Sequence, residues 1–171
     1  GDMVTGTIHP QLVETADLPV TEQVIAGAEI FAQFIGELAG AFPKIEVDCI
    51  FGNHGDIRNW GTKTYKRRYV NWDYLLYSYM KARLERTKHV AVNDHKSFFI
   101  TREIAGYLFL AMHGDDIRTW MNYPYYGIDR RIKELMEILS SRGEIIDYAL
   151  LGHFHGAAIL DKVKGEKIVN G

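Results

Sequence analysis

The chain has 171 residues, of which 47% are hydrophobic, and a formal net charge of −2. This composition is ordinary for a globular protein, and the near-neutral charge gives no global attraction to nucleic acid or to a membrane surface. No apolar stretch approaches the length of a membrane span, the longest being Tyr107 to Met112, so we expect no membrane partner. Cys49 is the single cysteine, which excludes a disulfide within one chain and predicts a reducing, cytoplasmic location.

Hydrophobic spacing predicts helices and strands that alternate along the chain, which is typical of an α/β fold. The length predicts one domain over residues 1–171. The chain begins with "GDMVTG" and ends with "KIVNG", and we expect both ends to be cuts inside a longer protein. Helices are predicted over 18–42, 71–85 and 127–143. Strands are predicted over 44–51, 98–101, 107–115 and 145–155, followed by a hairpin of 157–163 and 167–171.

Two of these helices have a predicted core face. Thr21 is the expected N-cap of the first, and the apolar residues near a 3.6-residue spacing are Val24, Ala28, Phe31, Ile35, Leu38 and Phe42. The corresponding face of the helix over 127–143 carries Ile132, Leu135, Met136 and Leu139.

Four of the seven histidines lie in three glycine-containing loops that follow predicted strands, at 52–56, 112–116 and 152–155. These histidines are His54, His113, His153 and His155. Side chains at i and i+2 of a strand point to the same side, so we expect the last two to converge on one point. Imidazole with carboxylate and amide ligands suits Zn, Mn, Fe or Ni. The alternative is an exposed histidine pair in a turn; His9, His89 and His95 are expected to be surface or loop residues.

The ordered motifs "GD", "GNH", "HGD" and "GHFH" resemble those of the calcineurin-like metallophosphoesterase superfamily over nearly the whole chain, from Asp2 to His155. This resemblance implies a four-layer α/β/β/α sandwich with mixed sheets and a two-metal centre. Manganese is the first expectation for these metals, with Fe, Zn, Ni or Mg as alternatives. It also implies a phosphoester hydrolase in which a metal-bridged hydroxide attacks phosphorus and His54 assists the leaving group.

The resemblance assigns a role to each matching residue. Asp2 resembles the carboxylate that bridges both metals, and His155 resembles a ligand of the first metal. The residues that resemble ligands of the second metal are Asn53, His113 and His153. His54 resembles the histidine that contacts the scissile phosphate without binding metal.

The chain departs from the family pattern in two places. The family has an Asp-x-His motif upstream of "GD", which this chain lacks, so we expect either a missing segment or an incomplete first metal site. An acidic residue often follows "GNH" in relatives, whereas here Gly55 follows and Asp56 comes next. We expect Asp56 to orient His54. Asp115 and Asp116 are expected either to orient His113 or to have a helix-capping or solvated role.

A basic, aromatic segment follows the "GNHGD" loop. Residues 58–88 carry nine basic and two acidic side chains, and Trp60, Tyr65, Tyr69 and Trp72 are interleaved with the first of them. Basic side chains contact phosphates and aromatic rings stack on unpaired bases. The expected substrate-binding residues are Arg58, Lys63, Lys66, Arg67 and Arg68. The alternative is a solvated loop whose aromatic side chains pack inward.

The same segment gives a looser resemblance to phage-encoded, repair-exonuclease-like members of the superfamily. That resemblance implies a nuclease or phosphodiesterase acting on DNA, and relatives of this type often form homodimers. Two other functions stay open: a phosphomonoesterase acting on a small molecule or phosphoprotein, and a non-catalytic binding module with a degenerate site.

Overall fold

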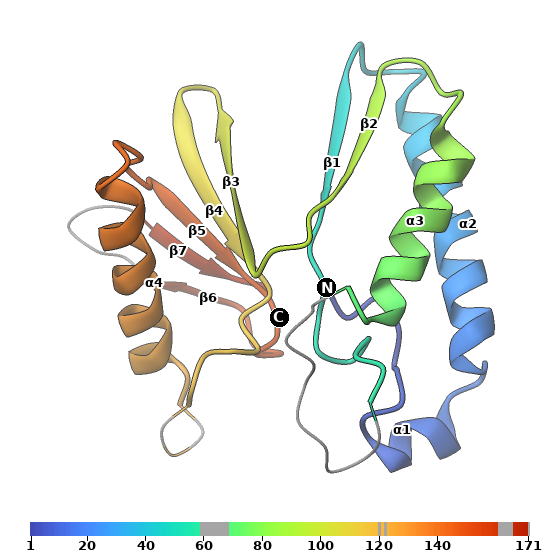
Figure 1. Cartoon of the computed structure of the whole chain (residues 1–171), viewed down its shortest axis with the longest axis horizontal. Helices are drawn as coiled ribbons and strands as arrows, with labels where there is room; N and C mark the ends of the chain where they lie inside the picture. Colours follow the sequence, from blue (N-terminus) through green and yellow to red (C-terminus); the bar gives the residue numbers. More distant parts are fainter. Residues whose placement is uncertain (59–68, 120, 122, 161–165, 171) are drawn as a thin grey trace. The chain divides into compact units, whose positions relative to one another are not determined.

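The computed structural model describes residues 1–58, 69–119, 121, 123–160 and 166–170. The chain separates into two compact units, Gly1–Ser97 and Phe98–Gly171. Both combine helices with a β-sheet (Figure 1), which confirms the α/β class. One domain over residues 1–171 and the four-layer sandwich stay predictions.

The first unit contains a parallel strand pair and three helices. Strand β1 (Ile45–Cys49) pairs with β2 (Val90–Asp94), from Ile45 opposite Val90 to Cys49 opposite Asp94. The helices are α1 (Pro10–Thr15), α2 (Val20–Leu38) and α3 (Trp72–Leu84). In Figure 1, α2 and α3 run side by side, and α3 packs against β2. The sequence did not predict α1 or β2.

Helix α2 buries part of the predicted stripe, including Val24, Ala28 and Ile35, whereas Phe42 was also predicted for the core and is 54% exposed. Its buried residues are Val24, Ala28, Ala32 and Ile35. Phe31 was predicted to be in the core but is 39% exposed, because the small side chains of Ala28 and Ala32 face α3 instead. The predicted N-cap was also wrong, since the helix begins at Val20 with Pro19 as N-cap and Thr21 lies in the first turn. The φ of −57° at Pro19 lies within the range that the proline ring imposes, so proline fits the position before the helix.

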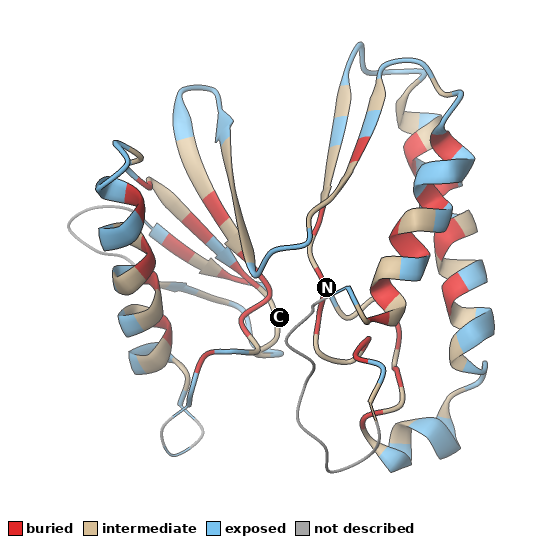
Figure 2. Cartoon of the chain, in the orientation of Figure 1, coloured by how far each residue is buried: buried red, intermediate tan, exposed pale blue. Residues whose placement is uncertain are grey.

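Helix α3 has the predicted bounds and a side-chain cap. Asn71 is the N-cap, and its side-chain oxygen accepts a hydrogen bond from the Asp73 N–H at 2.8 Å. The helix buries Leu76, Tyr77 and Met80 against Phe51 and the buried stripe of α2. In Figure 2, buried positions recur along both α2 and α3.

Cys49 belongs to this core and is expected to be chemically inert in the folded protein. It is 4% exposed, and burial raises the pKa of its thiol from 9.0 to about 12, with the nearby Asp94 adding to the rise. Alkylation should therefore be slow in buffer at pH 8 and complete in urea, as measured by titration with a thiol reagent. Because the folded-state pKa is raised, the stability linked to this thiol is fully present below about pH 9 and is lost as the pH rises towards 12. Rapid labelling of the folded chain would contradict the buried position.

The second unit is a five-stranded mixed sheet with one helix on a face (Figure 1). Its strands are β3 (Phe99–Ile104), β4 (Tyr107–Met112), β5 (Tyr148–Leu151), β6 (Ala158–Leu160) and β7 (Glu166–Val169). Their order is β3-β4-β5-β7-β6, in which β5 is parallel to both neighbours. The antiparallel β6–β7 pair confirms the predicted hairpin strands, and its connection at 161–165 lies outside the described residues.

Helix α4 (Tyr125–Ser140) covers the sheet with the predicted face. Ile132, Leu135 and Leu139 are buried together with Ile128, while Met136 is partly buried against the same core. Figure 2 shows the buried side of α4 turned towards the sheet. The half-exposed Asp129 pairs with the buried Lys167 of β7 across the same interface. Among the described residues, none of the helices is both long and apolar enough to cross a membrane.

Candidate metal and phosphoester site

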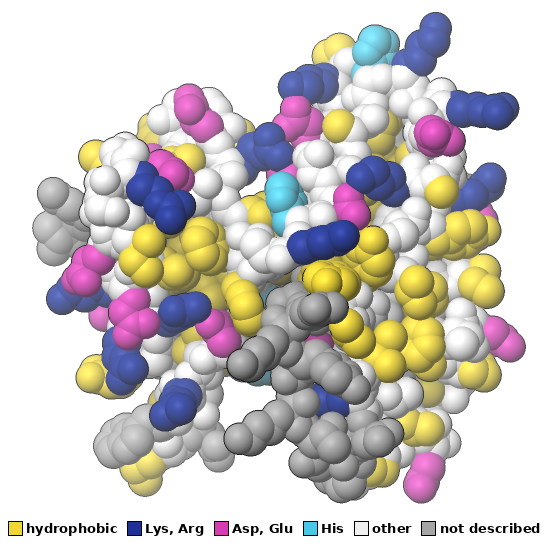
Figure 3. Space-filling model, viewed as in Figure 1, with side chains coloured by type: hydrophobic (Ala, Val, Ile, Leu, Met, Phe, Trp, Pro, Cys, Tyr) yellow, Lys and Arg dark blue, Asp and Glu magenta, His cyan; other side chains and the backbone are white. Residues whose placement is uncertain are grey.

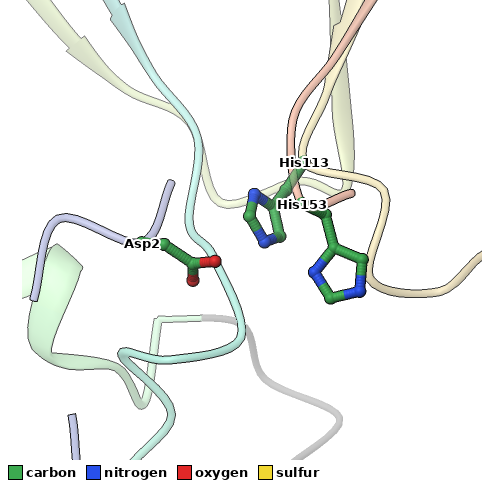
Figure 4. Close-up of side chains that lie close together, drawn as sticks. All are labelled: Asp2, His113 and His153. Carbon is green, nitrogen blue, oxygen red and sulfur yellow. The ribbon is translucent and has the colours of Figure 1, made fainter. Parts of the chain in front are cut away.

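Strands β4 and β5 bring two histidines together in the second unit. The strands are parallel neighbours, with Met112 opposite Leu151, so their carboxyl ends meet at one edge of the sheet. The Gly152 N–H donates to the His113 carbonyl at 3.0 Å and continues the pairing by one residue. Beyond it the imidazoles of His113 and His153 lie edge to face, with ring centroids 5.1 Å apart (Figure 4). His113 is buried and His153 is half-buried.

The backbone of the "GHFH" loop is not a strand, so the alternation argument for His153 and His155 was wrong. Strand β5 ends at Leu151, and the two histidines have φ values of 71° and 51°. This left-handed region is unfavourable for residues with a Cβ, and such conformations concentrate at functional sites. The loop directs His153 to His113 and packs its ring 5.3 Å from that of Phe154, whereas His155 is exposed.

The first unit places Asp2 beside the "GNH" loop that follows β1. The main-chain N–H of His54 donates to Asp2 Oδ1 at 2.8 Å. A Cβ on Gly52 would overlap the Asp2 carboxylate, so only glycine permits this approach. Asp2 itself has a φ of 55°, a third left-handed residue among the candidate ligands. Asn53 precedes His54 in the same loop and is half-buried.

Asp73 ties these segments together, and the sequence analysis missed it. This fully buried carboxylate accepts hydrogen bonds from three main-chain N–H groups: Asp2 and Met3 at 3.1 Å, and Gly52 at 2.8 Å. Burial raises the pKa of Asp73, against the opposing effect of the Gly52 and Met3 hydrogen bonds. Its only sequence signal was an acidic residue in the first turn of a capped helix, which is an ordinary feature of helices.

Asp56 was predicted to orient His54, but its described contacts are with Asn71 and Arg58. It is 2% exposed, accepts from Asn71 Nδ2 at 3.2 Å, and lies 3.9 Å from Arg58 Nε. The described contacts of the His54 ring are with other groups: Nδ1 lies 3.1 Å from the Thr5 carbonyl oxygen, and the His9 ring centroid is 5.2 Å away. His9 was expected to be an ordinary surface or loop residue, and its position beside His54 had no sequence signal.

The acidic residues after His113 separate into two environments. Asp116 forms an ion pair with Arg131 of α4 at 2.7 Å, which gives it a structural role. Asp115 is half-exposed in the same loop, and its predicted role in orienting His113 stays a prediction. His95 pairs with Asp48 at 2.8 Å where β1 and β2 end.

Much of the predicted substrate-binding segment lies outside the described residues. This applies to Lys63, Lys66, Arg67 and Arg68, and to Trp60 and Tyr65. Further along the basic run, Lys81 pairs with Asp94 at 2.6 Å and Arg83 with Glu29 at 3.0 Å, so these two charges are partly compensated.

The aromatic part of the segment is described only at its end. Tyr69 packs 6.2 Å from Tyr74, and the Lys96 ammonium lies over both rings. On the face drawn in Figure 3, the described Lys and Arg side chains are dispersed among acidic ones.

The donor set fits a divalent transition metal. Asp2, His113 and His153 each offer one ligand atom of a kind that holds metal ions. Imidazole nitrogen with carboxylate oxygen suits Mn, Fe, Zn or Ni better than Ca. Searches with the chain find no matching family model and no matching curated protein.

Proposed function

We propose that the protein is a metal-dependent phosphoester hydrolase with the four-layer metallophosphoesterase architecture, acting on nucleic acid. The observation that carries the proposal is the His113–His153 pair, held with ring centroids 5.1 Å apart by the parallel ends of β4 and β5. Two imidazoles at adjacent strand ends, one buried and one on a left-handed backbone, are a costly arrangement for a loop without a ligand.

The proposed metal ligands are the residues that the family resemblance assigns to this role. His113 and His153 would bind one ion together with Asp2 and the Asn53 amide oxygen, and His155 would bind a second ion that Asp2 shares. Bound divalent ions supply Lewis-acid stabilisation of phosphoryl oxygens and lower the pKa of water. The protein contributes the fixed positions of these ligands, and Asp73 holds the main chain on both sides of Asp2.

His54 is the proposed proton donor to the leaving oxygen. Its Nδ1 faces a main-chain carbonyl, which can only accept a hydrogen bond, so Nδ1 carries a proton. Nε2 is therefore the nitrogen that would meet the substrate, and the imidazolium, which is protonated at both ring nitrogens, is the form that would donate its Nε2 proton to the leaving oxygen. Proton transfer from a positioned side chain is typically worth about 10²–10⁴-fold in rate.

Nucleic acid is the proposed substrate because of the basic, aromatic segment that follows the "GNHGD" loop. A phosphomonoesterase remains the alternative, favoured by the compensation of Lys81 and Arg83 by acidic partners. The two differ in their dependence on Lys66, Arg67 and Arg68, whose neutralisation should weaken diester cleavage on DNA and leave a small monoester unaffected.

Metal binding and cleavage together test the proposal. We expect Mn²⁺ to bind, as measured by titration calorimetry, and His153→Ala to weaken that binding by more than about 10-fold, the lower bound for loss of an outer-shell partner. End-labelled single- and double-stranded DNA should be cleaved only with metal present. The substitution Asp116→Asn, at an acidic residue paired with Arg131, is the matched control and should leave affinity unchanged.

The substrates separate the outcomes of this test. Turnover of a p-nitrophenyl monoester with intact DNA would favour the monoesterase. Metal binding that His153→Ala does not alter would overturn the proposed ligand set. One bound metal and no turnover of any substrate would favour a binding module.

A further inference from the structure

The orientation of His54 depends on the main chain of Thr5. The Thr5 carbonyl oxygen is 3.1 Å from His54 Nδ1 and is the hydrogen-bond acceptor described for the ring. A carbonyl fixes which ring nitrogen carries the proton without adding a charge beside it. The position of this carbonyl therefore sets both the tautomer and the direction of Nε2.

Thr5 is held in turn by one side chain, Gln23 in the first turns of α2. Gln23 Oε1 accepts a hydrogen bond from the Thr5 N–H at 2.9 Å, and Nε2 lies 2.9 Å from Thr5 Oγ1. The other Nε2 hydrogen is donated to the Leu18 carbonyl at 2.7 Å, just before the helix begins. The amide oxygen and one amide hydrogen of Gln23 thus hold Thr5, and the other amide hydrogen holds the chain that leads into α2.

The next residue transmits any displacement of Thr5 directly to His54. Gly6 has a φ of 66°, and a Cβ at this position would overlap the His54 carbonyl oxygen. The main chain at Gly6 therefore lies closer to the main chain of His54 than a residue with a Cβ would allow. Three residues later the His9 ring packs 5.2 Å from the His54 ring, so the segment from Thr5 to His9 covers one side of the imidazole.

We infer that Gln23 is a positioning residue for His54 and acts through the main chain of Thr5. The sequence analysis had expected the Asp56 carboxylate to orient His54. The inference deepens the proposed function and rests on it, because His54 is the proposed proton donor. All the residues of the relay lie within the first unit.

The first test is spectroscopic and needs no turnover. When the ring is neutral, the ¹⁵N shifts of His54 should report a single Nδ1–H tautomer in the wild-type protein and a mixture of tautomers in Gln23→Leu. Thr5→Val, which keeps the carbonyl but removes the hydroxyl, should give a smaller change in the same direction. The matched control is Gln33→Leu, since Gln33 is an exposed glutamine on the same helix that bonds only Glu37 among its described contacts, at 2.9 Å.

The second test separates positioning from general damage. Gln23→Leu should lower kcat for DNA by about 10-fold, a fraction of the proton donor's roughly 10²–10⁴-fold, with KM unchanged. A p-nitrophenyl diester needs little help for its leaving group and should lose much less. Gln23→Glu keeps an acceptor for the Thr5 N–H but turns an oxygen without a proton towards the Leu18 carbonyl, so it should restore DNA cleavage only in part.

The outcomes distinguish this inference from the proposed function. A His54 tautomer that does not respond to Gln23→Leu, or equal losses on both diesters, would overturn the role of Gln23 even if the enzyme is active. A tautomer that responds in a protein without hydrolytic activity would support the relay and remove the proposed reaction.

Discussion

Replacing His54 by alanine is expected to lower kcat for DNA cleavage by about 10²–10⁴-fold, the typical worth of a positioned proton donor. The loss should be much smaller for a p-nitrophenyl diester, because that leaving group departs without protonation. Mn²⁺ affinity should stay within a few-fold of wild type. This combination separates a proton donor from a metal ligand, whose removal lowers affinity first.

The structure gives a specific reason for the retained affinity. The contact between His54 and Asp2 is made by the main-chain N–H, at 2.8 Å from Oδ1, and alanine keeps that group. The carboxylate of Asp2 therefore keeps its orientation when the imidazole is removed. The Thr5 carbonyl loses its ring contact but can be solvated in the space that the ring leaves.

The measurement is single-turnover cleavage of end-labelled DNA at saturating Mn²⁺, with calorimetric metal titration on the same samples. His89→Asn serves as the control because His89 is exposed and has a φ of 66°, a conformation that asparagine tolerates. A His54→Ala protein that cleaves DNA at the wild-type rate would remove the proposed role, and a large loss of metal affinity would make His54 a ligand instead.

The meeting of His113 and His153 could be predicted from the sequence in part. Each follows an apolar segment long enough for a strand, and the carboxyl ends of parallel neighbours share an edge. The end of β5 at Leu151 could not be predicted, because "LLGHFH" carries no signal that separates an extended backbone from the left-handed one observed at His153. The rings meet through that turn, and strand alternation contributes nothing.

Helix α2 shows why an apolar pattern can identify a helix while identifying its buried face only in part. Ile25, Ile30 and Phe34 are 55%, 65% and 55% exposed, so apolar side chains lie all around this helix. Its partner α3 selects the stripe of small residues that permits close packing, and that choice depends on residues about 50 positions away. Strand β2 was missed for a related reason, since its five residues include one buried side chain and its pairing with β1 is long-range.

The largest stability effect is expected at Asp73, whose importance arises from contacts across the sequence. Asp73→Ala should lower the free energy of unfolding of the first unit by about 2–4 kcal/mol, because three main-chain N–H groups lose their acceptor. Release of the buried carboxylate offsets part of this cost, since its desolvation disfavours the charged form. The Gly52 N–H contributes most, as it belongs to a buried residue, while those of Asp2 and Met3 can be solvated more easily.

Urea unfolding and amide hydrogen exchange measure this effect at two levels. The exchange of the Gly52 and Met3 amides should accelerate by more than that of the β4 and β5 amides, which lie in the second unit and keep their partners. Asp73→Asn retains one acceptor oxygen but turns an NH₂ group towards a donor, so its cost should be intermediate. Glu22→Ala is the matched control, an exposed acidic residue in the first turn of α2, and should cost less than about 1 kcal/mol. Equal costs for Asp73→Ala and Glu22→Ala would mean that the carboxylate acts only on its own helix; a larger cost for Asp73→Ala, with faster exchange at Gly52, would mean that it holds Asp2 and the "GNH" loop in place.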